Sequence, residues 1–495
     1  MKQIYETMKF LRKISLMVLS VFLIFSCHKD DDDVTTTDIN DFVWKGLNSW
    51  YYWKPNVPSL ADHAFSSPSE YKEFLSNKSP DNLFYSLLYD YPNKDRYSWI
   101  VDDVDALLQS FNGISKSSGI DFTLYYKDNG NYNVAGIINY VVPNSPASQA
   151  GLSRGEVIVA VNGADLNINN YRQLLNDQFS LSIAQNVSVS GNGVTTSGIS
   201  KTVSITTAVI EENPVAFYKT FSHNSKTVGY LVYNGFKSNY NDELNAAFAQ
   251  MKQDQVTDLI LDLRYNGGGS VETAIALGQM ITGQFTGSPY VRTDFNDKHN
   301  QFDKTESFSN KVKLYSSVNG STQQTGEQTV NSLNLNNVYI LTSGGTASAS
   351  ELTIDSLSPY INVVTIGAET YGKFVGSITL FDSPGQDFTS YSARNKGHNW
   401  AMQPITFAYF NSNNDPHPTK GFIPDHPINN YDNFGNIKEF GNPTDPALSK
   451  ALYLITGHVF KTSFPQTNFS RSQSFIANNK TLKRFETELY IQNLK

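Results

Sequence analysis

The chain has 495 residues, enough for three or four domains of ordinary size. Its hydrophobic content of 39% and charged content of 17% are typical of a globular protein. The net charge of −8 excludes the basic composition of a nucleic-acid-binding protein. Cys27 is the only cysteine, which excludes an intramolecular disulfide and a zinc site with several Cys ligands. The eight histidines form no HExxH or HxH pattern, so we expect them at structural or surface positions.

Residues 1–27 have the pattern of a targeting segment. Lys9, Arg12 and Lys13 precede an apolar run over residues 14–25, which is too short to span a bilayer. Ser26 stands directly before Cys27. This pattern resembles a bacterial lipoprotein signal, in which Cys27 becomes the lipidated first residue. An ordinary signal peptide, or a buried helix with a chance cysteine, is the alternative.

Residues 28–37 contain four consecutive aspartates and no large apolar cluster, so we expect a solvated tether. A lipid on Cys27 would hold the protein at a membrane. The resemblance to a lipoprotein places the chain in the cell envelope of a diderm bacterium, facing the periplasm or the cell surface.

Helical spacing of apolar residues predicts a small N-terminal helical domain over residues 38–108 and a terminal helix within residues 441–495. Phe42, Val43 and Leu47 illustrate the N-terminal pattern. These two segments enclose the β-rich and mixed regions that carry the motifs.

Residues 112–208 are β-rich and contain the segment SPASQAGL at 145–152, followed by Val-Asn-Gly at 161–163. The pattern predicts a loop, a short helix closed by Gly151, a strand and a tight turn. It resembles the PDZ domain of processing proteases.

A PDZ domain binds extended peptides at a sheet edge, and its loop amides capture the C-terminal carboxylate. The corresponding loop is Ser117, Ser118, Gly119 and Ile120, with one glycine fewer than is usual. The alternative is a PDZ fold that only packs on its neighbour.

From residue 211 to 440 the pattern alternates between strands and helices, which predicts an α/β core. The apolar run 259–263 suits a strand that is buried on both faces. Residues 313–335 are rich in Ser, Thr, Gln and Asn, and we expect an exposed loop there.

Three consecutive glycines, 267–269, follow the buried strand. Glycines let the backbone approach a ligand closely and point its N–H groups outward. A phosphate loop is excluded because no Gly-Lys-Ser/Thr follows. By itself the run is also compatible with a plain turn.

Ser348 lies where a predicted strand, 338–342, passes through a glycine-containing loop into a helix. The amides at a helix start favour a developing oxyanion. The alternative is that Ser348 only caps the helix, because Ser348-x-x-Glu351 matches a capping box.

Lys373 follows Gly372 after the next predicted strand, 363–367. One helix and one returning strand separate it from Ser348, so the lysine can come back beside the helix start. A lysine acts as a base only when it has lost its proton, which burial in an apolar pocket favours. The alternative is an ordinary surface lysine.

Taken together, these segments resemble the C-terminal processing peptidases of serine peptidase family S41. The resemblance covers roughly residues 112–430. It rests on three core motifs in the expected order and on a fourth, similar segment near the end of the core. They are DLR-x-N-GGG at 262–269, SASE at 348–351, GK at 372–373 and GF-x-PD at 421–425. In this family the lysine of the GK segment follows the serine by 25 residues. Ser348 has this spacing to Lys373, so the resemblance implies Ser348 rather than Ser343 or Ser350.

The resemblance implies a multidomain α/β protein with a crotonase-like protease core, preceded or interrupted by the PDZ domain. It implies a serine endopeptidase in which Ser348 is the nucleophile and Lys373 its base. The amides of Ala349 and of Gly267 or Gly268 would form the oxyanion hole. No metal or cofactor is implied, and the substrates would be proteins or peptides recognised through their C-terminal tails.

One departure from the family pattern concerns the group that orients the dyad. Many members have Gln four residues after the lysine, where this chain has Ser377. Ser377 is therefore a candidate orienting residue with a shorter reach.

Two other functions stay open at this point. The same scaffold could serve a non-catalytic protein that binds peptides or hydrophobic ligands. A tricorn-like Ser-His-Ser-Glu tetrad would need His63, the only histidine between the tether and the PDZ-like region. The sequence indicates no oligomeric state.

Overall fold

The computed structural model describes residues 34–128, 130–190, 193–318, 321–418, 420–428, 434, 436–459, 475–482, 487–492 and 494. The expected lipoprotein signal with Cys27, and most of the expected tether, lie outside these ranges. Within them, no helix has the length and apolar character needed to cross a membrane.

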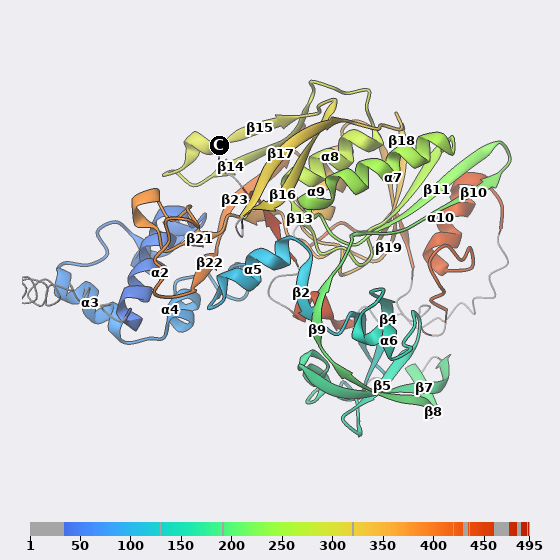
Figure 1. Cartoon of the computed structure of the whole chain (residues 1–495), viewed down its shortest axis with the longest axis horizontal. Coiled ribbons are helices and arrows are strands. Elements are labelled where there is room, and N and C mark those ends of the chain that lie inside the picture. The colour runs from blue at the N-terminus through green and yellow to red at the C-terminus, as the bar shows by residue number, and fades with distance from the viewer. Residues whose placement is uncertain are drawn as a thin grey trace, which may run out of the picture.

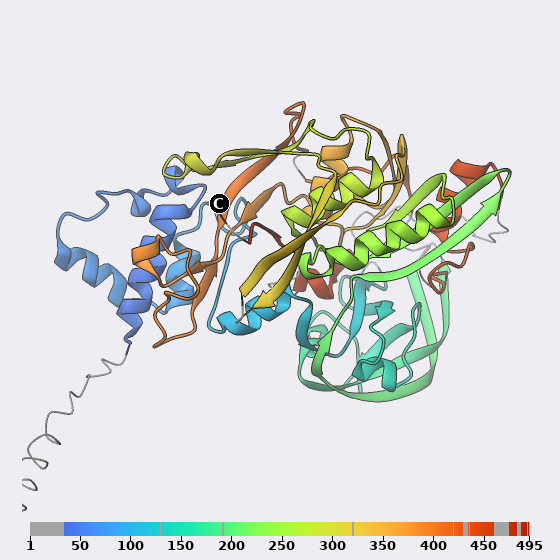
Figure 2. The same ribbon diagram turned by 45° about the horizontal axis from the view of Figure 1, so that its top comes forward.

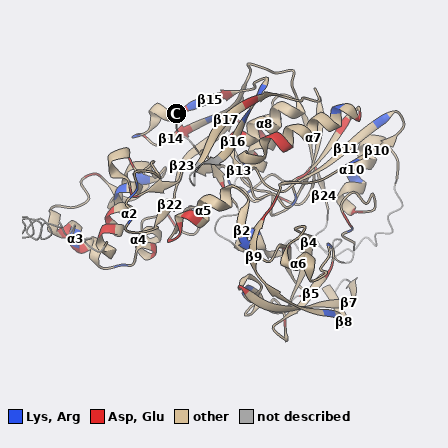
Figure 3. Ribbon diagram, viewed as in Figure 1, with Lys and Arg blue, Asp and Glu red and all other residues tan. Residues whose placement is uncertain are grey.

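The N-terminal helices lie at one end of the molecule, and the PDZ-like domain hangs below the α/β core (Figures 1 and 2). Lys and Arg are scattered among Asp and Glu along the described ribbon (Figure 3). The core strands and the helices beside them carry few charges, as expected of buried elements.

The N-terminal domain is mainly helical. Thr35 and Asp38 form a capping box that starts its first helix, and Phe42, Leu47 and Trp50 bury one face of that helix. The elements are α2 (Thr36–Trp50), η1 (Lys54–Asn56), η2 (Pro58–Leu60), α3 (Pro68–Ser76), α4 (Pro80–Ser86), β1 (Trp99–Val101) and α5 (Val104–Phe111).

The PDZ-like domain contains an antiparallel sheet with the strand order β25-β3-β4-β5-β7-β8, and β2 pairs separately with β9. Its first and last strands therefore lie side by side where the domain joins the core. The elements are β2 (Ile114–Ser117), β3 (Ile120–Tyr126), β4 (Val134–Val141), α6 (Pro146–Gln149), β5 (Val157–Val161), β6 (Ala164–Asp165), η3 (Tyr171–Leu175), β7 (Gln178–Ser190), β8 (Gly193–Thr206) and β9 (Ala208–Glu211).

The core is built on a six-stranded sheet with the order β10-β11-β12-β18-β19-β24, parallel except for β10. Helices α7, α8 and α9 cover one face, and α10 covers the other. The elements are β10 (Val215–His223), β11 (Lys226–Tyr233), η4 (Ser238–Tyr240), α7 (Asn241–Gln253), β12 (Asp258–Asp262), α8 (Val271–Ile281), β18 (Asn337–Thr342), α9 (Ala349–Leu357), β19 (Asn362–Gly367), β24 (His426–Pro427) and α10 (Pro446–Thr456).

The central strand β12 has the environment that its apolar run predicts. Leu259 and Leu261 pack into the cluster under α7–α9, whereas Ile260 packs against α10. All positions of the strand are buried. Such two-sided burial is typical of a parallel sheet.

A second six-stranded sheet has the order β13-β26-β20-β23-β14-β15, and a small third sheet has the order β1-β22-β21. The third sheet joins the N-terminal domain to the core. The elements are β13 (Gly269–Ser270), β14 (Pro289–Phe295), η5 (Asn300–Phe302), β15 (Lys304–Ser307), β20 (Val375–Ser377), β21 (Leu380–Phe381), η6 (Pro384–Gln386), β22 (Ala401–Gln403), β23 (Ile405–Asn411) and β26 (Leu489–Tyr490).

The exposed loop expected over residues 313–335 is wrong for most of its length. The chain forms a hairpin of β16 (Lys311–Val318) and β17 (Ser321–Thr329). Val312 and Leu314 pack into the main core cluster and anchor a hairpin whose other side chains are mostly polar. The polar composition of the segment did not predict this hairpin, because only two inward-facing side chains are needed to hold it on the core.

The terminal helix expected within residues 441–495 is present as α10, but the rest of this segment is only partly helical. After α10 it contains β25 (Phe475–Asn478), the short helix α11 (Asn479–Leu482) and β26. Both strands pair with distant partners, β25 with the PDZ-like strand β3 and β26 with β13 and β20. A strand that is stabilised by partners far away in the sequence has little local sequence pattern from which it can be predicted.

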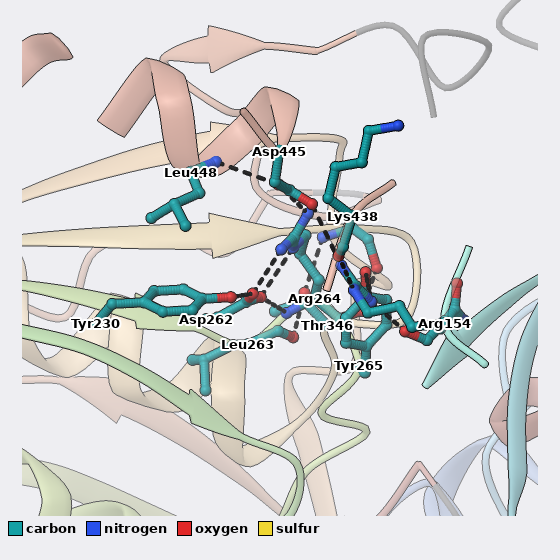
Figure 4. Close-up of polar contacts among 12 residues, drawn as sticks. Arg154, Tyr230, Asp262, Leu263, Arg264, Tyr265, Thr346, Lys438, Asp445 and Leu448 are labelled. Atoms are coloured by element: carbon teal, nitrogen blue, oxygen red, sulfur yellow. Dashed lines mark hydrogen bonds and ion pairs between the residues drawn. The ribbon is translucent and has the colours of Figure 1, made fainter. Parts of the chain in front are cut away.

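A buried ion-pair cluster at the end of β12 joins the core, α10 and the PDZ-like domain (Figure 4). Arg264 lies between Asp262 and Asp445, at 2.6 and 2.9 Å, and Arg154 of the PDZ-like domain bonds Asp445 at 3.3 Å. Burial opposes ionisation of Asp262, but Arg264 and Tyr230 outweigh it and hold the pKa of Asp262 below its ordinary value. The cluster therefore fixes the strand end from which the glycine turn departs.

Replacing Asp445 should destabilise the protein strongly, because Asp445→Ala leaves two buried guanidinium groups short of a counter-charge. We expect the free energy of unfolding, measured by urea denaturation, to fall by about 3–5 kcal/mol. Asp177→Ala, which removes an exposed ion pair with Lys116, should change it little. Equal effects of the two substitutions would contradict this role for the cluster.

Candidate active site

Ser348 lies at the junction of β18 and α9, as its sequence context predicts. It is the N-cap residue of α9 and adopts φ 57° and ψ −111°, a strained conformation for a residue other than glycine. Its side chain is fully buried, and its Oγ donates to the carbonyl oxygen of Thr487 at 3.3 Å. The capping box with Glu351 is therefore present together with a second, non-capping contact.

Lys373 comes back beside the same helix start. It is 1% exposed, which excludes the surface-lysine alternative. Its Nζ donates to the carbonyl oxygen of Thr487 at 2.9 Å and pairs with the Glu488 carboxylate at 3.2 Å. Ser348 Oγ and Lys373 Nζ thus converge on one carbonyl oxygen.

Glu351 ties the two segments together. Its buried carboxylate accepts hydrogen bonds from the amides of Ser348, Lys373 and Gly372 at 2.9, 2.9 and 2.6 Å, and from the Thr370 hydroxyl at 2.6 Å. Burial raises the pKa of Glu351, while these four bonds oppose the rise. Sequence reasoning treated Glu351 only as a capping partner; its second set of donors comes from a loop about 20 residues away.

The glycine turn after β12 lies directly against Ser348. A side-chain carbon on Gly268 would stand 2.6 Å from the Cβ of Ser348. The Gly268 amide donates to the Asn266 side chain at 2.9 Å. Of the amides expected in an oxyanion hole, those of Gly267 and Ala349 have no acceptor among the residues that the structure describes.

No hydrogen bond joins Ser377 to Lys373 in the described part of the chain; the Ser377 hydroxyl has other partners. Its hydroxyl bonds the carboxylate of Glu488 at 3.1 Å, and Gln403 donates to that hydroxyl at 3.0 Å. Trp99 also donates to the Glu488 carboxylate. Burial raises the pKa of Glu488, and the charge of Lys373 opposes the rise. Glu488 was not singled out from the sequence, because no motif marks it.

In the expected carboxylate-binding loop, two backbone amides already donate hydrogen bonds to nearby serine hydroxyls. The Gly119 amide donates to the Ser117 hydroxyl at 3.1 Å, and the Ile120 amide donates to the Ser118 hydroxyl at 3.3 Å. The neighbouring edge of β3 pairs with β25. The edge that the sequence predicts to bind a peptide is therefore already paired with β25.

A cleft of about 1050 Å³ opens between the N-terminal domain, the PDZ-like domain and the core. Tyr97, Thr123, Tyr265 and Gly372 are among the residues that line it. It therefore reaches from the β3 side of the PDZ-like domain to the residue next to Lys373. His63, in contrast, is exposed in a loop before α3, and no contact with Ser348 or Lys373 is recorded for it in the described chain.

Comparison with known proteins agrees with this architecture. The sequence profile of peptidase family S41 matches residues 227–428, that of the peptidase S41 N-terminal domain matches 38–99, and that of a PDZ domain matches 137–185. The two S41 profiles together cover more than half of the chain. The chain belongs to peptidase family S41.

Its relatives include a probable CtpA-like serine protease of Staphylococcus aureus (strain MRSA252), 25% identical over 338 residues. That match covers 68% of this chain and 56% of the relative. A carboxyl-terminal-processing protease of Picosynechococcus sp. is 25% identical over 248 residues, covering 49% of this chain and 51% of the relative. The chain thus spans about half the length of these two relatives, and 28% of the length of a CtpA-like protease of Staphylococcus epidermidis.

A solved structure from Bacteroides fragilis NCTC 9343, assigned to the S41 proteases, superposes with a TM-score of 0.63. The two chains are 25% identical, and the match covers 84% of this chain and 97% of the other. The expected S41 fold with a PDZ domain and an N-terminal domain is confirmed.

Gly372 should tolerate no side chain. It has φ 86°, and a side-chain carbon there would overlap the carbonyl oxygen of Lys420. We expect Gly372→Ala to displace Lys373 and to lower the free energy of unfolding by about 1–3 kcal/mol. Urea denaturation measures the change, and Gly385→Ala, whose site has open space, is the control. An unchanged free energy of unfolding in Gly372→Ala would contradict the positive φ and the close contact at Gly372.

Asp355, in the helix that Ser348 begins, should make stability depend on pH. Burial, with Asp415 nearby, raises the pKa of Asp355 from 3.8 to about 7, although Asn411 donates to it. A carboxyl whose pKa is raised by folding stabilises the fold fully below pH 3.8, and this contribution is lost as the pH rises through 7. His417, the other titratable group beside it, lies 3.8 Å away.

We therefore expect the free energy of unfolding to fall between pH 4 and 7 by up to about 4 kcal/mol more in the wild type than in Asp355→Asn. Urea denaturation at several pH values measures the difference. Parallel pH profiles for the two proteins would show that Asp355 titrates normally.

Proposed function

We propose that this chain is a serine endopeptidase that hydrolyses peptide bonds in protein or peptide substrates through a Ser348–Lys373 dyad. The observation that carries the proposal is the convergence of Ser348 Oγ and Lys373 Nζ on one carbonyl oxygen in a buried site. The match to peptidase family S41 and the names of its relatives support the same reaction class.

In the proposed reaction, neutral Lys373 takes the proton of the Ser348 hydroxyl as the oxygen attacks the substrate carbonyl. The amides of Ala349 and Gly267 stabilise the oxyanion of the tetrahedral intermediate. Lys373 then gives the proton to the leaving amine, and an acyl-enzyme remains. A water molecule, deprotonated by Lys373, hydrolyses it and restores Ser348.

We further propose that the core is crotonase-like and that the PDZ domain helps to recognise substrate C-terminal tails. The cleft that joins β3 to Gly372 supports this path for an extended peptide. The lipid anchor on Cys27 and the location in the cell envelope remain proposals that rest on the N-terminal sequence.

The test compares the wild type with Ser348→Ala and Lys373→Ala, using denatured casein and a folded protein that carries an unstructured C-terminal tail. Cleavage, followed by gel electrophoresis, should fall roughly a thousandfold in each variant, because the two residues act as a unit. Ser392→Ala and Lys396→Ala, both at exposed positions, are the controls and should cleave normally. Activity that persists in both dyad variants would refute the dyad, and binding of the tail without cleavage would favour the non-catalytic alternative.

A further inference from the structure

The C-terminal tail, meaning the described residues 475–482 and 487–492, lies on the two surfaces that a substrate would use. Its first part forms β25 on the edge of β3, with Ala477 opposite Leu124 and Asn478 opposite Thr123. Asn479 continues the pairing with its side chain, which accepts from the Phe122 amide at 3.1 Å and donates to the Ile120 carbonyl at 3.3 Å. The PDZ edge is thus filled up to its carboxylate loop.

The second part of the tail enters the dyad. Strand β26 lies between β13 and β20, so the tail completes the second core sheet. The Gly269 amide donates to the Glu488 carbonyl at 2.5 Å, and the Thr487 carbonyl accepts from both Ser348 and Lys373. Leu489 and Tyr490 are buried beyond this point, and Tyr490 stacks on Phe111 with ring centroids 4.2 Å apart.

The Glu488 side chain opposes the base function of Lys373. The Glu488 carboxylate and the Lys373 amine are 3.2 Å apart and almost completely buried, at 3% and 1% exposure. A general base must lie within hydrogen-bond reach of the proton that it takes, whereas the Lys373 amine is already bonded to Glu488 and Thr487. Ser377 and Trp99 hold the carboxylate in place.

The tail is also oriented against its own cleavage. The oxygen of the Thr487 carbonyl receives the hydrogen bonds from Ser348 Oγ and Lys373 Nζ. In a reactive complex the carbonyl carbon would face Ser348 Oγ, and the oxygen would face the amides of Gly267 and Ala349. The tail therefore resembles a bound inhibitor more closely than a substrate.

We propose that the C-terminal tail is an intramolecular inhibitor of this peptidase, displaced when an extended substrate segment takes both the β3 edge and the dyad. This inference rests on the proposed function, because it assigns a regulation to the same site. A tethered segment acts at an effective concentration of about 1 mM. A substrate that reaches only one of the two surfaces competes poorly, so the tail selects long, unstructured segments.

The first test ejects the tail from the full-length chain. Leu489→Asp places a charge at a fully buried position of β26, which favours release of the strand. Cleavage of denatured casein that depends on Ser348 should rise about tenfold or more, because activity follows the fraction of open sites. Val459→Asp, at an exposed position before the tail, is the matched control and should leave the rate unchanged.

A second variant tests the proposal even if Leu489→Asp does not fold. Ser270 and Tyr490 lie opposite each other on the neighbouring strands β13 and β26. The distance between facing residues of paired strands suits a disulfide. In Ser270→Cys/Tyr490→Cys, oxidation should lower the casein-cleaving rate about tenfold, and reduction of the same sample should restore it. The single variant Ser270→Cys should not respond to oxidation.

Two outcomes of these variant tests would refute the proposal that the tail is an inhibitor. Equal rates of the oxidised and reduced double-cysteine protein would show that the tail does not block the site. A folded Leu489→Asp protein that loses activity would show that the tail is a working part of the active site, with Glu488 as a partner of Lys373.

A readout without catalysis separates this inference from the proposed function. In Ser348→Ala with saturating denatured casein, amide hydrogen exchange at residues 487–492 should speed up at least tenfold, as the substrate displaces the tail. Accelerated exchange combined with no Ser348-dependent cleavage in any variant would refute the peptidase and leave the displacement intact. Unchanged exchange would refute the displacement.

Discussion

The buried carboxylate of Glu351 is the interaction on which the active-site geometry depends. It collects four donors, from the Ser348 amide on one side and from the loop containing Thr370, Gly372 and Lys373 on the other. A carboxylate moved out of water is costly unless its oxygens are fully bonded, and here each oxygen has two donors. The helix start and the lysine loop therefore cannot shift independently, and the Ser–Lys geometry follows.

A second constraint holds the opposite wall of the site. The Asp262–Arg264–Asp445 cluster fixes the end of β12, from which the glycine turn runs to Gly268 beside Ser348. Arg154 extends the same cluster into the PDZ domain, so the PDZ domain and the glycine turn share one buried network. Any tilt of the PDZ domain relative to the core would disturb charges that have no access to water.

The C-terminal tail links these two parts in a different way. It pairs with the PDZ strand β3 and then fills the place between β13 and β20, where Glu488 meets Lys373. A substrate in the proposed reaction and the tail would therefore compete for the β3 edge and for the same place beside Ser348 and Lys373. The departure from the family pattern at Ser377 fits this arrangement, because the shorter side chain reaches the Glu488 carboxylate.

The sequence by itself determined the family, the order of the domains and the pair of residues proposed for chemistry. Local signals suffice for these: β12 is an unbroken apolar run, Gly372 and the glycine turn have no substitute at their backbone angles, and the spacing of Ser348 and Lys373 is set along the chain. Only the tertiary structure decided that Glu351 binds both the helix start and the lysine loop. It also decided that the Gly268 amide donates its hydrogen bond to Asn266. It alone placed the tail on the dyad, because β25 and β26 gain their hydrogen bonds from strands hundreds of residues away, and a strand defined by distant partners leaves no local pattern to read.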